Sequence, residues 1–244
     1  MTTAVSIHQV AKRFGEHELF AGVSFEVRTG EIFAVLGGSG CGKSTLMRLM
    51  IGLDQPTSGS IEVLGYDIAR DVEAVRASIG VTFQSGALFG SLSLLENVML
   101  PFTIFTDLPY RTRLDLARMK LALVGLLDSE ALMPAEISGG MAKRAALARA
   151  LALDPPLIFL DEPSAGLDPV SSASLDHLIL DLRQMLGTTF VVITHELPSI
   201  LTIADRCVML DAAAKGVVAI GKPLELKQRS ASPVVRAFFN REAA

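Results

Sequence analysis

A glycine-rich stretch early in the chain has the residue types and spacing needed to hold the phosphates of a nucleotide. The pattern is glycine, four further residues, glycine, lysine and serine, in the run Gly37, Gly38, Ser39, Gly40, Cys41, Gly42, Lys43 and Ser44. Glycines let backbone amides close around phosphate oxygens, and the following helix adds the partial positive charge of its N-terminus. Lys43 supplies a cation to the β- and γ-phosphates, and the Ser44 hydroxyl can ligate Mg²⁺. The run predicts an ATP and Mg²⁺ site rather than a turn that merely precedes a lysine.

Two consecutive carboxylates close an apolar segment later in the chain. Residues 157–160 read as a buried strand, and Asp161 and Glu162 follow directly. An aspartate at the carboxyl edge of such a strand would face the phosphate-binding loop and hold Mg²⁺ through water, and the next glutamate can polarise the attacking water. Acidic residues also end many strands without any such role, so the pair gains its weight from the phosphate-binding loop.

Four single residues are less specific candidates. A lone histidine such as His195, after an apolar strand, is usually structural, but its place after the acidic pair favours a contact with the γ-phosphate. Phe14 taken alone is more often a core residue than a platform for adenine. Gln84 alone carries no signal, and Cys41 reads as a small residue tolerated in the loop rather than a redox centre.

The elements that must position these residues alternate between strands and helices. Strands are predicted at 5–10, 20–27, 31–36, 157–160, 189–193 and 207–210. Residues 32–36 are nearly all apolar, as in a strand buried on both faces, and lead through the glycine-rich run into a helix at about 43–53. A second helix is predicted at 171–186. The order strand, helix, strand indicates parallel pairing in an α/β core.

The middle of the chain, roughly residues 86–153, has helical patterns and almost no strand signal. Helices are predicted there at 92–105, 110–127 and 139–153. We expect this segment to form a helical subdomain inserted into the sheet domain. At the C-terminal end, Ser232 and Pro233 predict a short amphipathic helix that begins at a serine cap with proline in its first position.

The composition suits one large α/β domain, or a core domain with a smaller subdomain. The 244 residues are 50% hydrophobic and 20% charged, and the mean hydropathy of +0.44 is high for a soluble protein. No apolar run approaches the ~18 residues of a membrane span. The high mean hydropathy therefore indicates an apolar surface that a partner buries. The N-terminus lacks the features of a secretory signal, which predicts a cytoplasmic protein.

Charge and cysteine content argue against other classes of site. The net charge is −4 without a sustained basic block, which disfavours a large nucleic-acid footprint. The two cysteines, Cys41 and Cys207, lack the spacing of metal ligands, so neither a disulfide framework nor a zinc site is expected.

Three further runs give the chain a resemblance to a known family. They are Ile137-Ser138-Gly139-Gly140-Met141, Leu147-Ala148-Arg149-Ala150-Leu151 and Phe159-Leu160-Asp161-Glu162-Pro163. Together they resemble the signature, Walker B and D-loop block of ABC ATPases, and the resemblance covers nearly the whole chain. It implies an α/β fold: a P-loop NTPase (RecA-like) core, an N-terminal antiparallel β subdomain and an inserted α-helical signature subdomain. Residues 1–244 would then form one ABC ATPase domain, with 1–85 and 154–244 as β subdomain plus core and 86–153 as the insertion.

The resemblance also implies roles for individual residues. Glu162 matches the catalytic glutamate, His195 the switch histidine and Gln84 the glutamine that senses Mg²⁺ and the γ-phosphate. Mg²⁺ would be bound by Ser44, Gln84 and Asp161. Nucleotide contacts are implied for Phe14, which stacks on adenine, and for Gly37, Gly38, Ser39, Gly40, Cys41, Gly42, Lys43, Ser44, Thr45, Ser138, Gly139, Gly140 and Asp168.

The signature departs from the usual Leu-Ser-Gly-Gly-Gln at its two ends, where this chain has Ile137 and Met141. The serine and both glycines remain, so the ATP cap is expected to survive, while the missing glutamine puts in doubt the hydrolysis rate and its coupling to the partner. Met141 together with Phe83-Gln84-Ser85-Gly86-Ala87-Leu88-Phe89 resembles the Mla/Mce-type lipid-transport branch. Further runs similar to that branch are Thr194-His195-Glu196-Leu197, Ile203-Ala204-Asp205-Arg206 and the C-terminal segment 235–241.

Several partners follow from the resemblance. The signature lies in a separate predicted subdomain and cannot easily reach the nucleotide of its own chain, so two copies are expected to enclose two ATP molecules. Without a pore of its own, the chain would drive an integral membrane permease from the cytoplasmic side of the inner membrane. A periplasmic lipid-binding subunit and a small cytoplasmic accessory subunit are also implied, and no nucleic acid is expected.

Two alternatives stay open for the permease contact. The apolar residues 86–89 and 92–105 can form the dock for a permease helix, or they can simply be the core of the helical subdomain. For the function, the alternatives are the ATPase subunit of a small-solute importer and a soluble ABC ATPase outside transport. One compact chain of 244 residues, without paired domains or a long coiled coil, disfavours the soluble class.

Overall fold

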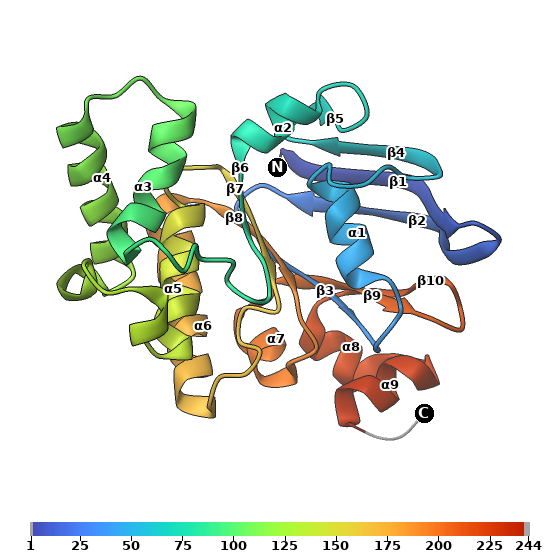
Figure 1. The fold of residues 1–244 in the computed structure, drawn as a ribbon. Helices are drawn as coiled ribbons and strands as arrows, with labels where there is room; N and C mark the ends of the chain where they lie inside the picture. The colour runs from blue at the N-terminus through green and yellow to red at the C-terminus, as the bar shows by residue number, and fades with distance from the viewer. Residues whose placement is uncertain (1, 242–244) are drawn as a thin grey trace.

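The computed structural model describes residues 2–241, which form two sheets with helices around them (Figure 1). The smaller sheet is antiparallel, in the order β2-β1-β4-β5. Its strands are β1 (Thr3–Phe14), β2 (His17–Arg28), β4 (Ser58–Val63) and β5 (Tyr66–Asp67). Buried and exposed residues alternate along much of β1 and β2, because one face of this sheet packs on the core.

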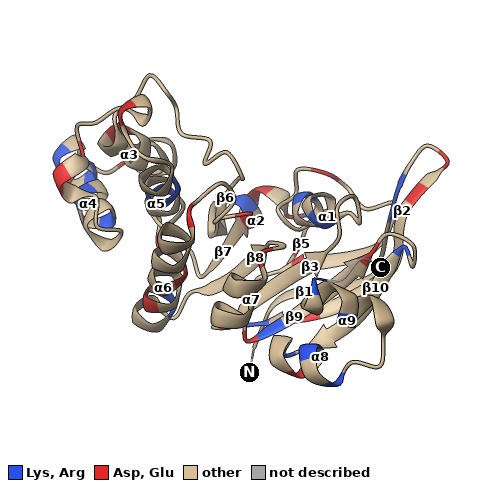
Figure 2. Cartoon of the chain, turned by 90° about the horizontal axis from the view of Figure 1, so that it is seen from below, with Lys and Arg blue, Asp and Glu red and all other residues tan. Residues whose placement is uncertain are grey.

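The larger sheet has the order β10-β9-β3-β8-β7-β6, and all of its pairings are parallel except that of β10 with β9. Its strands are β3 (Ile32–Gly37), β6 (Ile79–Thr82), β7 (Leu157–Asp161), β8 (Thr189–Ile193), β9 (Arg206–Asp211) and β10 (Gly216–Gly221). Every residue of β3 and β8 is buried, and the strands of this sheet carry few charged side chains (Figure 2). The predicted parallel α/β core is confirmed.

Helices cover both faces of the larger sheet. Helix α1 (Lys43–Met50) packs between the two sheets, where Leu46 and Leu49 join one apolar cluster with residues of both. On the opposite face, α6 (Pro169–Leu186) and α7 (Leu197–Ile203) pack against the strands. The remaining helices of these parts are α2 (Val72–Ser78), α8 (Pro223–Arg229) and α9 (Pro233–Asn240).

Three helices to one side of the sheets have an apolar core of their own (Figure 1). They are α3 (Leu94–Phe105), α4 (Tyr110–Leu123) and α5 (Gly139–Ala150), with 3-10 turns at Leu127–Ser129 and Pro134–Glu136. Helix α3 begins at a capping box: the Ser93 hydroxyl accepts from the Glu96 amide, and the Glu96 carboxylate accepts from the Ser93 amide at 2.8 Å. Division of the chain at residues 86 and 153 stays a prediction.

The structure corrects several predicted helix ends. The helix predicted to reach residue 127 ends at Leu123, because Gly125 takes a left-handed φ of 70° and turns the chain. The helix predicted over 139–153 ends at Ala150, and the one predicted to begin at residue 92 begins after Ser93. Ser232 stands at the cap position of α9, as predicted, but its side chain makes no capping hydrogen bond. None of the helices among residues 2–241 has the length and apolarity of a membrane span.

Candidate functional site

Three neighbouring strands of the larger sheet end together and bring the main candidate residues to one edge. Val35 of β3 and Asp161 of β7 both pair with Ile193 of β8, which lies between them. The glycine-rich run continues from β3, Glu162 follows β7, and His195 follows β8. Because the carboxyl ends of parallel strands share one edge, residues far apart in the sequence meet there.

The glycine-rich run forms a loop that leads directly into α1. Gly37, Gly40 and Gly42 have φ values of 147°, 76° and 98°, which side-chain-bearing residues rarely adopt. A Cβ on Gly42 would also lie 2.7 Å from the ring of Phe20, so glycine is required there for space as well. The Lys43 ammonium donates to the carbonyls of Gly37 and Gly38, at 2.9 Å each. The loop thus wraps around the Lys43 ammonium, at the N-terminal end of α1, which carries a partial positive charge.

The remaining residues of this loop divide between its outer and inner sides. Gly38, Ser39, Gly40 and Ser44 are exposed, and Thr45 is half-buried. Cys41 is buried among apolar residues of the core, and this burial raises the pKa of its thiol. A buried thiol of raised pKa is a poor nucleophile, so the structure gives Cys41 a packing environment and no redox feature.

Asp161 and Glu162 each have a buried carboxylate oxygen without a hydrogen-bond partner among the described residues. Burial raises the pKa of Asp161, and the neighbouring Glu162 raises it further, while the cations Lys43 and Lys143 oppose both effects. Glu162 has a left-handed φ of 47°, and its amide donates to the carbonyl of Ile193 at 2.8 Å. Unpaired buried oxygens are costly in a folded protein, so this edge suits a cation or a donor that completes it.

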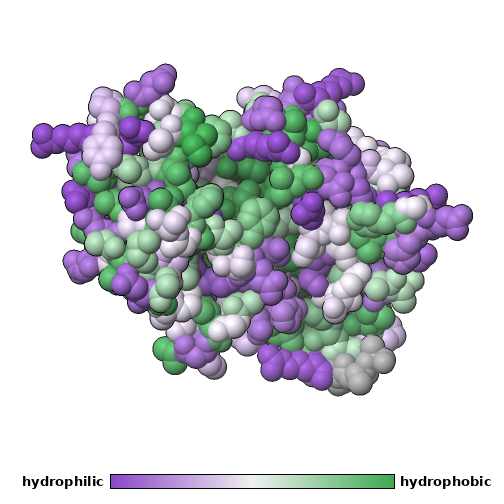
Figure 3. Space-filling view, in the orientation of Figure 1, coloured by the Kyte–Doolittle hydropathy of each residue, from purple (hydrophilic) through white to green (hydrophobic). Residues whose placement is uncertain are grey.

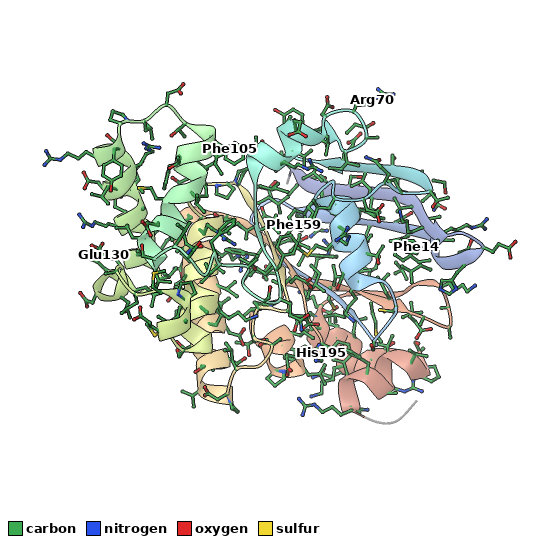
Figure 4. The ribbon with its side chains drawn as sticks, viewed as in Figure 1. Phe14, Arg70, Phe105, Glu130, Phe159 and His195 are labelled. Atoms are coloured by element: carbon green, nitrogen blue, oxygen red, sulfur yellow. The ribbon has the colours of Figure 1, made fainter. Side chains whose placement is uncertain are left out.

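His195 and Glu162 are in direct contact. The distance between His195 Nδ1 and Glu162 Oε1 is 2.8 Å, and the imidazole side chain is 57% exposed. Figure 4 shows His195 beside α7 at the lower edge of the sheet. The remaining ring nitrogen, Nε2, lies 3.8 Å from Glu196 Oε1. The pair has the geometry of a carboxylate that a histidine orients, with one ring nitrogen left over.

Gln84 lies in the exposed loop that follows β6. It borders the same cleft as Asp161, a hollow of about 510 Å³ that Phe83, Ser85, Ala165 and Gly166 also line. Phe14 lies apart from this cleft, on the smaller sheet (Figure 4). It is 53% exposed, and the Lys12 ammonium stands 5.1 Å from the centre of its ring. The structure therefore places Gln84 at the same cleft as Asp161, whereas Phe14 lies on the other sheet with its ring partly exposed beside Lys12.

Ser138, Gly139 and Gly140 form the first turn of α5, away from the phosphate-binding loop of the same chain. Figure 1 shows α5 and α1 on opposite sides of strands β6, β7 and β8. Ser138 caps the helix by accepting from the Met141 amide at 3.3 Å, and both Ser138 and Gly139 are exposed. Asp168 caps α6 nearby, accepting from two backbone amides and from the Ser171 hydroxyl, and these hydrogen bonds lower its pKa.

Two basic residues of α5 also belong to the site: Lys143, which no sequence pattern singled out, and Arg149, which lies in the signature block but had no role assigned to it. The Lys143 ammonium donates to the carbonyls of Gln84 and Glu162, and the Arg149 guanidinium donates to those of Gly86 and Ala87. Both contact backbone oxygens, which no motif records. A helical projection of α5 with Ser138 at its start shows which residues share a face, but not which loop that face meets.

Comparison with known proteins identifies a matching family and similar transport proteins. A family model described as "ABC transporter" matches residues 20–165. The probable ribonucleotide transport ATP-binding protein mkl of Mycobacterium tuberculosis is 41% identical over 244 residues, covering 98% of this chain and 67% of that protein. The intermembrane phospholipid transport system ATP-binding protein MlaF of Escherichia coli K12 is 41% identical over 240 residues, covering 97% and 88%.

A solved structure agrees with these relatives. It is the dimeric, post-hydrolysis state of the ATP-binding cassette MJ0796 bound to ADP and Pi. It superposes with a TM-score of 0.80 at 29% identity, and the match covers 89% of this chain and 98% of that one. The fold is therefore shared over most of the chain.

Proposed function

Because this chain belongs to the ABC transporter family as an ATP-binding subunit, we propose that it hydrolyses ATP as one half of a dimer and so drives a phospholipid permease. One observation carries the proposal. The phosphate-binding loop, Asp161 and the Glu162–His195 pair lie at a single edge of a parallel sheet. This edge offers a phosphate cradle, a carboxylate for a metal ion and a base, which are the parts that hydrolysis of a nucleoside triphosphate requires.

The residues at this edge suit a complex of ATP with Mg²⁺. Asp161 presents an unpartnered buried oxygen, and Ser44 is exposed at the end of the loop. Ser44 and Asp161 would hold the ion, with Gln84 at the rim of the cleft, since Mg²⁺ usually takes only one or two protein carboxylates besides phosphate and water. When bound, the ion would neutralise negative charge on the phosphates. Lys43 would exchange its two loop carbonyls for phosphate oxygens.

Glu162 is the group best placed to accept the proton of an attacking water. Its Oε1 is held by His195, and its Oε2 is buried with no partner among residues 2–241, so one acceptor remains for a water. His195 fixes the direction of the carboxylate and leaves Nε2 for the γ-phosphate. Both roles depend on the contact between Glu162 and His195.

A second copy of the chain would seal the nucleotide. The exposed turn of Ser138 and Gly139 offers backbone amides at the start of a twelve-residue helix, and such a turn binds anions. It lies across the sheet from Lys43, so the phosphate it meets would belong to the partner. The dimer of the similar cassette MJ0796 supports this arrangement. ATP then binds more tightly to the closed dimer than to separate subunits, and hydrolysis releases the closure.

The structure distinguishes two groups of residues in the proposed permease dock. Leu88, Leu94, Val98 and Phe102 belong to the core of the helices, while Phe89, Ile104 and Phe105 stay exposed. Phe105 borders a hollow of about 200 Å³ between α2 and α3, where hydrophobic residues gather (Figure 3). Arg149 also lines this hollow and holds the loop just after Gln84. An apolar permease helix seated here would press on the loop that borders the catalytic cleft.

Replacing Phe105 with glutamate should weaken the permease complex at least about tenfold, since a charge in an apolar contact costs more than about 1.4 kcal/mol. The ATPase activity of the isolated subunit should stay within about twofold, because Phe105 is 59% exposed and none of the residues assigned to the nucleotide lines its hollow. Co-purification of the tagged subunit with the permease measures the effect. Leu224→Glu on α8, where the side chain is 56% exposed, is the matched control. Equal recovery of the permease with both variants would remove the dock from this hollow.

The proposed cargo is phospholipid. The MlaF relative supports it, as do Met141 and the run from Phe83 to Phe89, although mkl is named for ribonucleotide transport at the same identity. A small-solute importer is the other candidate. The chain would sit peripherally on the cytoplasmic face of the inner membrane, with a periplasmic lipid-binding subunit and a small accessory subunit as further partners.

Lipid analysis of the purified complex distinguishes the two cargoes. Mass spectrometry of the complex, released from membranes in detergent and washed, should find phospholipid at about one molecule per complex or more. The complex with Phe105→Glu, purified through the permease, should keep that lipid, because the cargo site lies in the permease. Absence of retained lipid, together with ATPase stimulation by ribonucleotide, would favour the small-solute class.

A further inference from the structure

One lysine of the signature helix reaches both loops that flank the catalytic cleft. Lys143 lies in the second turn of α5, the helix that Ser138 caps. Its ammonium donates to the carbonyl of Gln84, and at 3.2 Å to the carbonyl of Glu162. A single side chain thus connects three segments that are distant in sequence: the signature helix, the loop after β6 and the end of β7.

The surroundings of this ammonium give it few alternatives. It is half-buried, and burial lowers its pKa, while the carboxylates of Asp161 and Glu162 act in the opposite direction. A partly desolvated cation is stable only when hydrogen-bond acceptors and negative charge replace the lost water. The carbonyls of Gln84 and Glu162 are the acceptors that the described residues provide.

The backbone of Glu162 needs such support. With φ at 47°, Glu162 adopts a conformation that costs a residue with a side chain of order 1 kcal/mol or more. Three contacts hold the backbone of Glu162: its amide donates to the Ile193 carbonyl at 2.8 Å, and its carbonyl accepts from the Ala165 amide and from the Lys143 ammonium, at 3.2 Å each. The direction of the Glu162 carboxylate depends on this backbone, so Lys143 acts on the base through the main chain.

We propose that Lys143 is a positioning residue for ATP hydrolysis, which couples the signature helix to Gln84 and Glu162 of the same chain. The role rests on the proposed ATPase function. When the partner's nucleotide draws in the first turn of α5, the ammonium carries the movement to both carbonyls. Arg149, on the same helix, holds Gly86 and Ala87 and does not contact the acidic pair. Lys143 therefore provides the direct link from the signature to the base.

Kinetics of Lys143→Met separate this role from a structural one. Methionine keeps the length and apolar stem of the side chain but removes its donors. The kcat for ATP should fall at least about tenfold, which corresponds to about 1.4 kcal/mol in activation free energy, with the KM for ATP within about twofold. Lys143→Arg, which retains the charge and the donors, should recover most of the rate. A Lys143→Met protein that unfolds would be replaced by Lys143→Gln, whose amide can serve only one carbonyl.

Arg144→Met is the matched control, because Arg144 neighbours Lys143 on α5 and is half-buried as well. Amide exchange in the nucleotide-free protein gives a second readout. The segments with Gln84 and Glu162 should exchange faster in Lys143→Met and at the wild-type rate in Arg144→Met. A kcat within twofold of wild type, or a loss no larger than that of Arg144→Met, would overturn the proposal. An inactive wild-type protein would instead contradict the ATPase function itself.

Discussion

Glu162→Gln should lower ATP turnover at least about 100-fold, which is the effect expected when a general base is removed. The amide has the shape of the carboxylate and can keep the contact with His195, but it cannot take a proton from water. ATP binding should survive, because Lys43 and the loop are untouched. We expect a dimer that forms with Mg²⁺ and ATP and persists. Phosphate release and size-exclusion chromatography with and without ATP measure the two effects.

Glu196→Gln is the control for this variant. Glu196 also faces His195, at 3.8 Å from Nε2, and its side chain is 42% exposed. If Glu162 is the base, ATP turnover by the Glu196→Gln protein should stay within a few-fold of wild type. Turnover by Glu162→Gln above about half the wild-type rate would show that another group accepts the proton.

Ser138→Arg should also lower ATP turnover at least about 100-fold, while each isolated subunit still binds ATP. The bulky cation replaces an exposed hydroxyl at the start of α5 and blocks the turn that seals the partner's nucleotide. Loss of one such oxyanion-type contact commonly costs 10²–10³ in rate. Nucleotide binding at low protein concentration, followed by fluorescence, should be unchanged, since Ser138 lies away from Lys43.

Ala135→Arg serves as the comparison for steric bulk. Ala135 is exposed in the turn just before the signature and belongs to the same helical region. The Ala135→Arg protein should keep both ATP binding and ATP turnover. If Ser138→Arg also lost ATP binding as a monomer, the signature would act on the nucleotide of its own chain.

Local signals in the sequence were sufficient for the parts of the site that lie on one segment. The loop from Gly37 to Ser44 and the acidic pair at the end of β7 each combine an apolar strand with polar residues at its end, and both stand at the strand ends where they were predicted. Local signals could not predict the contact between His195 and Glu162, because it depends on β7 and β8 being neighbours in register. That register follows from pairing between distant segments, which no single pattern records.

The contacts that the sequence did not reveal are made to the backbone. Lys143 and Arg149 bind carbonyl oxygens, which every residue has, so their partners depend on the rotation of α5 against β6. Leu126 explains one wrong helix end: it is buried in the helical core and continues the apolar period beyond the turn at Gly125. Strands such as β6 and β5 are too short for a period to be visible.

The composite site is tested most directly by mixing Lys43→Ala with Ser138→Arg, each inactive by itself. In a mixed dimer, one site has a wild-type loop and a wild-type signature, while the other site carries both changes. Subunit exchange at equal concentrations should restore ATP hydrolysis to about a quarter of the wild-type rate, because half of the dimers are mixed and each has one intact site. A mixture no more active than its two components would contradict a nucleotide shared between two copies.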